Sequence, residues 1–330
     1  MEPIRMGMVG AGWIAQDHRR VLESLPEAEL VAVCDIDGER ATALAAGNGA
    51  RVYQDWRDLL DREELGALVV CTPPATHREP AIAALDHGLP IYLEKPIART
   101  PEDAAAIVAA AERTGTVCAI GYQWHALDLL EDLPELLAGQ QIGLLAGASI
   151  GPTQRRPWFV NMRAGGGNLL ERGSHHMDLA RKVAGEVAAV QTAAGRVRLA
   201  RSGGEDGDTD DALTIVLQLA SGALATIVVA WTQSGQPGNY GLDIVASEAT
   251  LRLALDPDFT LTGMSRGQQV TRQAGSHPME RSMRTFLHAV SERDPAAVIC
   301  RPPDAAATLA VAVAAERALE TSRAVPVESP

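Results

Sequence analysis

The chain has 330 residues, 46% of them hydrophobic and 22% charged, a composition typical of globular proteins and not of disordered or membrane-spanning chains. Its formal net charge of −13 argues against a nucleic acid or an anionic membrane as partner, because either would require a basic face. The length favours two domains with separate cores. The chain begins without the pattern of a secretory signal and contains no apolar run of membrane-spanning length, so we expect a cytoplasmic protein.

Short apolar runs alternate with helical patterns in the first third of the chain, which is typical of β-α-β units. The runs are continuously apolar because the strands of a parallel sheet are buried on both faces. The expected strands are residues 4–9, 30–34, 68–71, 91–93 and 117–120. The expected helices are residues 14–25, 38–46, 76–87 and 101–113. We therefore predict a Rossmann domain, a doubly wound parallel sheet, over residues 1–122.

Longer β-type runs prevail after residue 122 and predict an α+β domain over residues 123–330. We expect this domain to bind substrate and to form oligomers, with a mostly antiparallel sheet and helices on one face. The expected strands are residues 145–150, 187–199, 212–219, 223–231, 242–245, 250–255 and 259–262. The expected helices are residues 127–137, 168–183, 279–293 and about 305–322, of which the last can pack back on the Rossmann domain.

Residues 223–231 are apolar at nearly every position, whereas an antiparallel strand with one wet face should alternate. A second surface should therefore cover the open face of the sheet. We predict a homodimer or homotetramer formed through that face. The alternative is a strand buried by loops of its own chain.

A glycine turn, Gly10-Ala11-Gly12-Trp13-Ile14-Ala15, directly follows the first strand and opens a helix. Gly10 permits a tight turn and Gly12 a close approach of the backbone to a pyrophosphate, which can sit on the helix N-terminus. Asp35 ends the second strand, where a carboxylate binds the ribose 2′-hydroxyl of NAD and repels the 2′-phosphate of NADP. We expect NAD as cofactor, bound by Gly10, Gly12, Trp13, Ile14 and Asp35; a turn with glycines for geometry alone is the alternative.

Further candidates for the cofactor site follow the next two strands. Thr72 and Pro73 come after residues 68–71, and His77 begins the next helix, where it either packs or contacts the cofactor. Glu94-Lys95-Pro96 ends the strand at 91–93. We expect the Lys95 ammonium to project toward the nicotinamide and Glu94 to orient the amine or the cofactor, although an ion pair at the surface would also explain these two residues.

A glycine-rich segment, residues 165–178, carries a second set of candidates. Glu171, His175 and Asp178 are spaced i, i+4, i+7, which places them on one face of a helix. A metal site is disfavoured, because adjacent histidines on a helix, here His175 and His176, point about 100° apart. We expect no metal there, and a solvated hairpin turn rather than a calcium loop at the acidic residues 205–211.

Together these motifs resemble the Gfo/Idh/MocA oxidoreductase family, which includes glucose-fructose oxidoreductase and inositol dehydrogenase, over nearly the whole chain. The resemblance implies Lys95 and His175 as the catalytic pair beside the nicotinamide, with Glu171 as their carboxylate partner. Most relatives carry aspartate at that position, so Glu171 either orients His175 or binds a substrate hydroxyl. The activity implied is hydride transfer between NAD and a secondary alcohol or ketone of a sugar, sugar derivative or cyclitol.

This chemistry assigns roles to the implied pair. Oxidation of an alcohol requires a base for the hydroxyl proton, and His175 is suited to that transfer. Lys95 can stabilise the negative charge that develops on the oxygen. Two alternatives stay open: a redox-neutral lyase or glycosidase that uses NAD transiently, and a sensor that binds NAD without chemistry.

Substrate contacts are expected from residues that follow the Rossmann domain. The segment Tyr122-Gln123-Trp124-His125 stands where many relatives carry arginines. The two tryptophans can stack on a sugar ring or pack in the core, and the arginines can hold a hydroxyl-rich or anionic group. The candidates are Tyr122, Trp124, Arg155, Arg156, Trp158, Arg163 and His176. For His176, a packing role or a place near the cofactor is the alternative.

The four cysteines, Cys34, Cys71, Cys118 and Cys300, show no C-x-x-C spacing. The first three lie in or at the end of apolar runs, so we interpret the cysteines as reduced core residues. A catalytic thiol is disfavoured, because nothing near them in sequence would lower a thiol pKa.

Overall fold

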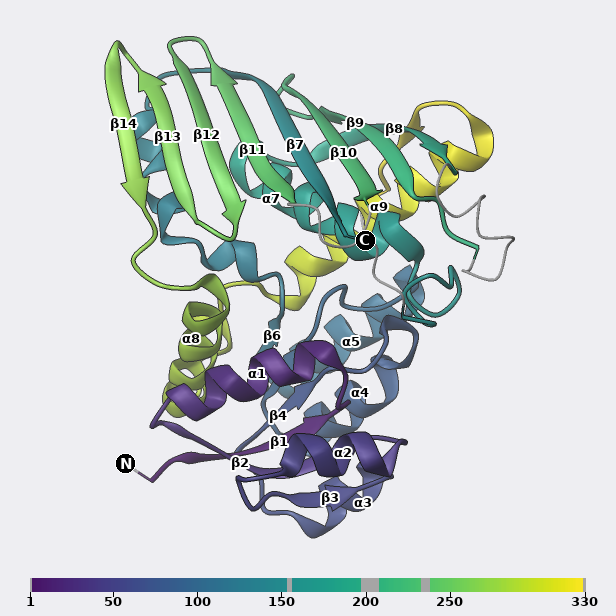
Figure 1. The fold of residues 1–330 in the computed structure, drawn as a ribbon. Helices are drawn as coiled ribbons and strands as arrows, with labels where there is room; N and C mark the ends of the chain where they lie inside the picture. The colour runs from purple at the N-terminus through teal and green to yellow at the C-terminus, as the bar shows by residue number, and fades with distance from the viewer. Residues whose placement is uncertain (1, 153–155, 197–207, 233–237, 329–330) are drawn as a thin grey trace. The chain divides into compact units, whose positions relative to one another are not determined.

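The computed structural model describes residues 2–152, 156–196, 208–232 and 238–328 (Figure 1). The chain forms two compact units: Met1–Ala126 with Pro278–Ala306, and Leu127–His277 with Ala307–Pro330. The domain boundary expected at residue 122 stays a prediction. Among the described helices, none combines the length and the apolar character needed to cross a membrane.

The first unit contains a six-stranded parallel sheet with strand order β3-β2-β1-β4-β5-β6. The strand order changes direction between β1 and β4, which is the switch point where doubly wound sheets bind their ligands. This sheet confirms the predicted Rossmann fold. Its strands are β1 (Ile4–Val9), β2 (Ala28–Cys34), β3 (Arg51–Tyr53), β4 (Ala67–Val70), β5 (Ile91–Leu93) and β6 (Cys118–Ile120).

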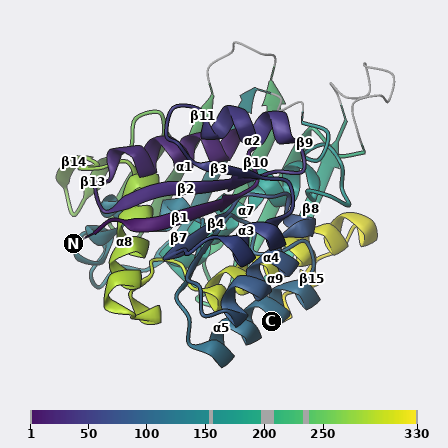
Figure 2. The same cartoon turned by 90° about the horizontal axis from the view of Figure 1, so that it is seen from below.

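Helices cover both faces of this sheet. Figure 2 shows α1 (Trp13–Ser24) and α2 (Gly38–Ala45) on one side of it, and α4 (Arg78–Asp86) and α5 (Pro101–Thr114) on the other. The short helix α3 (Trp56–Arg62) was not predicted, because its seven residues are too few to establish a periodic pattern. α2 and α5 begin where the sequence supplies a capping side chain, Asp37 and Thr100 respectively.

The helix α8 (Pro278–Glu292) belongs to the first unit, although residues 127–277 of the second unit precede it in the sequence. Its residues Met283, Phe286 and Leu287 join the core that α1 and α2 form with the sheet. The Phe286 ring meets the Tyr92 ring edge to face, with 5.7 Å between ring centroids. The helical period predicts that one face of this segment is buried, but it does not say against which sheet.

The second unit is built on a nine-stranded sheet with strand order β14-β13-β12-β11-β7-β10-β9-β8-β15. All neighbouring strands are antiparallel except β7 and β10, which confirms the predicted mostly antiparallel sheet. The end of the strand expected at 187–199 lies outside the described residues. The strands are β7 (Ile142–Pro152), β8 (Val187–Gly195), β9 (Ala212–Leu219), β10 (Leu224–Thr232), β11 (Asn239–Ala246), β12 (Ala249–Asp256), β13 (Thr260–Ser265), β14 (Gln268–Gln273) and β15 (Val325–Pro326).

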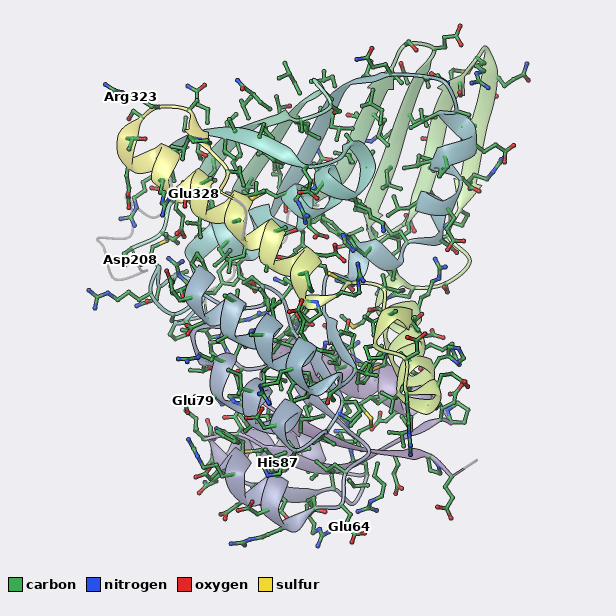
Figure 3. All side chains as sticks on the ribbon, turned by 180° about the vertical axis from the view of Figure 1, so that it is seen from behind. Glu64, Glu79, His87, Asp208, Arg323 and Glu328 are labelled. Carbon is green, nitrogen blue, oxygen red and sulfur yellow. The ribbon has the colours of Figure 1, made fainter. Side chains whose placement is uncertain are left out.

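Two helices, α7 (Ser174–Ala184) and α9 (Pro302–Thr321), lie against one face of this sheet (Figures 1 and 3). A buried polar contact joins them: the Thr308 hydroxyl donates to Asp178 Oδ1 (2.8 Å) and accepts from the Arg181 guanidinium (2.7 Å). The predicted helix at 127–137 is wrong. The structure has two short turns there, Asp128–Glu131 and α6 (Leu133–Leu136), because Pro134 lacks the N–H that would continue a helix.

The other face of the nine-stranded sheet carries apolar side chains that the described part of the chain leaves exposed. Along β10, Ala225, Ile227 and Val229 are buried, whereas Leu224 is 46% and Val228 is 38% exposed. By register, one row crosses the sheet on this open face through adjacent strands: Met264, Thr250, Val245, Leu144 and Leu224. Four of these five side chains are large, apolar and exposed. The described loops therefore do not supply the expected cover.

Candidate active site

The glycine turn between β1 and α1 has the geometry that a pyrophosphate site requires. Gly10 has a φ of +96°, and a Cβ there would meet the Cys71 carbonyl at 2.6 Å, so only glycine fits. A Cβ built on Gly12 meets no atom within 4 Å. No side chain among the described residues caps the first turn of α1. This open, uncapped helix N-terminus fits the phosphates of a dinucleotide.

Asp35, directly after β2, fixes the glycine turn. Its Oδ2 accepts a hydrogen bond from the Ala11 backbone N–H (2.7 Å), and its Oδ1 accepts one from the Asp37 N–H (2.9 Å). Each carboxylate oxygen can accept a further bond, so a ribose hydroxyl can still bind there. Ile36, which the sequence analysis missed, is 88% exposed beside it and offers an apolar contact to an adenine ring. The signal was available: an isoleucine stands between two aspartates at a strand end.

His77 packs inside the first unit. Its Nε2 lies 2.8 Å from the Thr72 carbonyl oxygen, and its Nδ1 lies 3.0 Å from the Pro96 carbonyl oxygen. The ring therefore links the loop after β4 to the loop after β5. Burial lowers its pKa, against the opposing effect of these carbonyl groups. This placement favours the packing role of His77 over a cofactor contact. The Thr72 hydroxyl, by contrast, is a buried oxygen at the same edge of the sheet and has no hydrogen-bonding partner in the described part of the chain.

The carboxylate of Glu94, after β5, lies in the interior of the first unit. His18 of α1 donates to Glu94 Oε1 through Nε2 (2.7 Å), and the Lys95 backbone N–H donates to Oε2 (3.0 Å). Burial raises the pKa of Glu94, but the His18 hydrogen bond and the nearby charges outweigh it, so that the pKa is lowered overall. Because this carboxylate is buried, Glu94 does not form an ion pair at the surface, which was the alternative for Glu94 and Lys95.

His18 is the second residue that the sequence analysis missed. It lies three residues after Ala15 and four before Leu22, so it shares the buried stripe of α1 with them. A buried histidine needs a hydrogen-bonding partner, and this pattern could have indicated one. Lys95 also carried a stronger signal than its motif, because the chain contains only one other lysine, Lys182, among 29 basic residues.

In the second unit, Glu171 lies in a π-helical turn, Leu169–Gly173, that precedes α7. The expected continuous α-helix at 168–183 is therefore wrong in its first turn. A π-turn holds one more residue per turn than an α-turn, and the shared face expected for Glu171 and His175 stays a prediction. Glu171 is buried and His175 half-buried. Such turns are frequent at functional sites.

The triple glycine that leads into this π-turn supports it. Gly166 and Gly167 have φ values of +74° and +61°. A Cβ on Gly167 would meet the Thr209 hydroxyl at 2.1 Å, and that hydroxyl accepts from the Asn168 N–H (3.0 Å). Thr209 and Asp211 are buried, so the predicted solvated turn is wrong for these two residues. Residues 205–207 lie outside the described residues.

His176 joins α7 to the nine-stranded sheet. Its side chain is fully buried, and its Nε2 donates to the Gly241 carbonyl oxygen (3.0 Å). A Cβ on Gly147 of β7 would meet the ring at 2.7 Å, so that glycine makes room for it. Burial lowers the pKa of His176 to about 4. The listing of His176 among substrate contacts is therefore corrected to a packing role.

The remaining substrate candidates differ in exposure. Tyr122 and Trp124 are buried in the first unit, which favours core packing. In the second unit, the Trp158 ring packs on an aromatic cluster with Phe159, whereas Arg163 is exposed and Arg156 half-buried. Arg155 lies outside the described residues.

All four cysteines are buried and form no disulfide with one another, as predicted. Burial raises the pKa of the Cys34 thiol to about 12 and raises the pKa of Cys71 and Cys118 as well. A thiol with a raised pKa is a poor nucleophile at neutral pH.

Comparison with known proteins gives a match to two family profiles. The family described as "Oxidoreductase family, NAD-binding Rossmann fold" matches residues 4–122. The "GFO/IDH/MocA C-terminal domain" matches residues 145–252. Together these profiles cover more than half of the chain and parts of both of its sheets.

Individual relatives agree with these profiles. The chain is 26% identical to a myo-inositol 2-dehydrogenase of Thermotoga maritima, over 98% of this chain and 99% of the relative. It is 39% identical to inositol 2-dehydrogenase 3 of Saccharopolyspora erythraea, but that match covers only 34% of this chain and 33% of the relative. The solved WlbA dehydrogenase of Bordetella pertussis, in complex with NADH and UDP-GlcNAcA, has the same fold, with a TM-score of 0.83, 21% identity and 99% of each chain covered.

The buried state of His176 predicts a loss of stability in weak acid. Its folded-state pKa of about 4 lies below the ordinary value of 6.5, so the unfolded chain binds a proton that the folded chain does not. The contribution of neutral His176 to the free energy of unfolding is therefore complete above pH 6.5 and is lost as the pH falls toward 4. We expect the free energy of unfolding to be roughly 2 kcal/mol lower at pH 5 than at pH 7.5 from this group.

Urea unfolding at the two pH values checks this prediction. His176→Gln keeps a donor for Gly241 but cannot titrate, so its pH dependence should be weaker by that amount. His87→Gln, at an exposed position, is the matched control and should keep the wild-type dependence. Equal pH dependence in wild type and His176→Gln would contradict the assignment.

Proposed function

Because the chain belongs to the Gfo/Idh/MocA family of NAD-binding oxidoreductases, we propose that it transfers a hydride between NAD and a secondary alcohol or ketone. The substrate class is a sugar, a sugar derivative or a cyclitol. This choice is supported by the relatives, since one is named for myo-inositol and another was solved with a sugar nucleotide.

One observation carries the proposal. Gly12, Asp35, Thr72 and Lys95 follow β1, β2, β4 and β5 of one parallel sheet, so all four stand at its carboxyl edge. That edge, at the switch point of the strand order, is where doubly wound sheets bind dinucleotides. NAD, when bound there, supplies the hydride acceptor. The open N-terminus of α1 holds the phosphates, and Asp35 holds the adenosine ribose through its 2′-hydroxyl.

The chain's own residues handle the proton and the charge. His175 removes the hydroxyl proton of the alcohol as the hydride leaves, because a neutral imidazole is a suitable base near pH 7. Lys95 donates a hydrogen bond to the same oxygen and stabilises its developing negative charge. Glu171, at the π-turn before α7, orients His175 or binds a neighbouring hydroxyl. For ketone reduction the two groups act in the reverse direction.

The oligomeric state and the location in the cell are part of the same proposal. The exposed apolar row on the open face of the nine-stranded sheet supports assembly of two or four copies through that face. Four buried cysteines without a disulfide between them suit a reducing compartment, which supports a cytoplasmic location.

The test of the proposed function is the absorbance of reduced nicotinamide when NAD meets a panel of cyclitols, aldoses, glycosides and sugar acids. We expect a rise with one class. Lys95→Ala and His175→Ala should each lower that rate by a factor on the order of 10² to 10⁴. Substrate consumption with retained NAD and no NADH would instead indicate the redox-neutral enzyme, and NAD binding with no consumption would indicate a sensor.

Cofactor preference is tested at Asp35. Asp35→Asn keeps an acceptor for Ala11 but removes the charge, so NAD should bind on the order of tenfold more weakly and discrimination against NADP should fall. Asp55→Asn removes the same charge from the cap of α3 and should change neither affinity. Titration of both nucleotides measures the ratio. An unchanged ratio in Asp35→Asn would exclude the 2′-hydroxyl assignment.

Assembly is tested at the centre of the open face. Val228→Lys places a charge on the exposed apolar surface, so we expect a smaller assembly by sedimentation velocity. Val52→Lys changes an equally exposed valine of β3 in the other unit and should not alter the assembly. A wild-type protein that sediments as a monomer would contradict the proposal.

A further inference from the structure

The Glu94 carboxylate is held from several elements at once. His18 of α1 and the Lys95 N–H bind its two oxygens, at 2.7 and 3.0 Å. The other titratable groups whose charge acts on it, or on which its charge acts, are Cys71, Tyr92 and His77. Each of these three is buried. The nearby charge of Lys95 lowers the pKa of Glu94. A buried carboxylate can stay charged only while its hydrogen bonds persist, because burial of an unpaired charge costs free energy.

The surroundings of His18 orient its ring as a hydrogen-bond donor to this carboxylate. The His18 side chain is fully buried, and its Nδ1 has no hydrogen-bonding partner among the described residues. Its Nε2 faces the carboxylate, which can only accept, so Nε2 is the donor of this hydrogen bond. The ring also meets the Tyr92 ring edge to face, with 5.2 Å between centroids, which fixes its plane. The Nε2 of His18 is therefore held in the direction of Glu94.

The end of β6 leaves room for this carboxylate. A Cβ built on Gly121 would lie 3.0 Å from Glu94 Oε1 and 3.2 Å from Oε2. The backbone of Gly121 has no positive φ, and the three atoms nearest to an alanine Cβ there would all belong to Glu94. Gly121 is therefore a second, independent sign that the position of the carboxylate is specified.

We propose that His18 is a positioning residue for the hydride-transfer site: it fixes the Glu94 carboxylate, which in turn holds the backbone of Lys95 through the Lys95 N–H. This inference rests on the proposed function, because it assigns a support to the lysine proposed to bind the reacting oxygen. Without the His18 donor, the buried carboxylate keeps the desolvation that raises its pKa and loses the bond that lowers it. The Glu94 carboxylate then takes up a proton, and its hydrogen bond with the Lys95 backbone N–H weakens.

Activity gives the first readout. His18→Leu should lower kcat at pH 7 by a factor on the order of 10 to 100, since small misplacements of catalytic groups have effects of this size. Affinity for NAD should stay within about threefold, because the phosphate and ribose contacts are untouched. The rate of this variant should recover as the pH rises and Glu94 loses its proton. His18→Gln, which offers a donor near the same place, should restore most of kcat.

The second readout does not depend on activity. The chain has two lysines, so protein labelled with ¹⁵N-lysine gives two lysine amide signals, from Lys95 and Lys182. In His18→Leu the Lys95 signal should shift, lose protection from exchange and change with pH as Glu94 titrates. The Lys182 signal should stay in place. His18→Gln should return the Lys95 signal toward its wild-type position.

Gly121→Ala and a surface control complete the test. Gly121→Ala should displace the carboxylate and reproduce the shift of the Lys95 amide and the loss of kcat, with His18 intact. His87→Leu, at the exposed position labelled in Figure 3, should leave both readouts unchanged. If His18→Leu fails to fold, kcat and the Lys95 amide signal of Gly121→Ala and His18→Gln test the proposal instead.

A wild-type kcat and an unmoved Lys95 amide in folded His18→Leu or in Gly121→Ala would overturn the proposal. A loss of kcat in His18→Leu with the Lys95 amide unmoved would overturn it too. If wild-type protein oxidises no member of the substrate panel, the proposed function fails. In that case the amide signals still decide whether His18 holds the Lys95 turn.

Discussion

The strands of a parallel sheet end at one edge, and this constraint determines the candidate site of the first unit. The loops that follow β1, β2, β4 and β5 meet there, and their polar groups must be satisfied with little access to water. The chain does this with side chains that bond to the backbone of another loop. Asp35 binds the Ala11 N–H, and His77 lies between the carbonyl groups of Thr72 and Pro96. The same bonds that satisfy these groups also fix the loops on which NAD and the substrate would bind.

The second unit follows a different constraint. Its sheet has one face against α7 and α9, and buried polar contacts through Thr308 and His176 determine where the helices lie. The opposite face is apolar along Leu144, Leu224 and Val228 without cover from the described residues. The π-turn before α7 departs from regular helix just where the sequence places Glu171. Irregular structure of this kind has a cost, and it is retained most often where function needs a side chain in an unusual direction.

Patterns with a single structural solution could be predicted from the sequence. Continuous apolar runs between helical segments allow little but a parallel sheet, and the glycine turn with Asp35 indicated a dinucleotide site before any contact was known. Features that depend on distant residues could not be predicted. Helical period shows that α8 is amphipathic, but only tertiary structure places Phe286 against Tyr92. Likewise, His18 and Glu94 are 76 positions apart, and neither residue type alone indicates the other. The π-turn was missed because residue spacing assumes a regular period.

In the proposed reaction, a hydride moves from a substrate carbon to NAD with net redox. A direct test uses the substrate that the panel identifies, carrying deuterium at the carbinol carbon, with mass spectrometry of the nicotinamide after one turnover. We expect the deuterium to appear in NADH, one atom for each molecule of ketone formed. Deuterium that returns to the product carbon while NAD stays oxidised would contradict net redox and identify a redox-neutral enzyme.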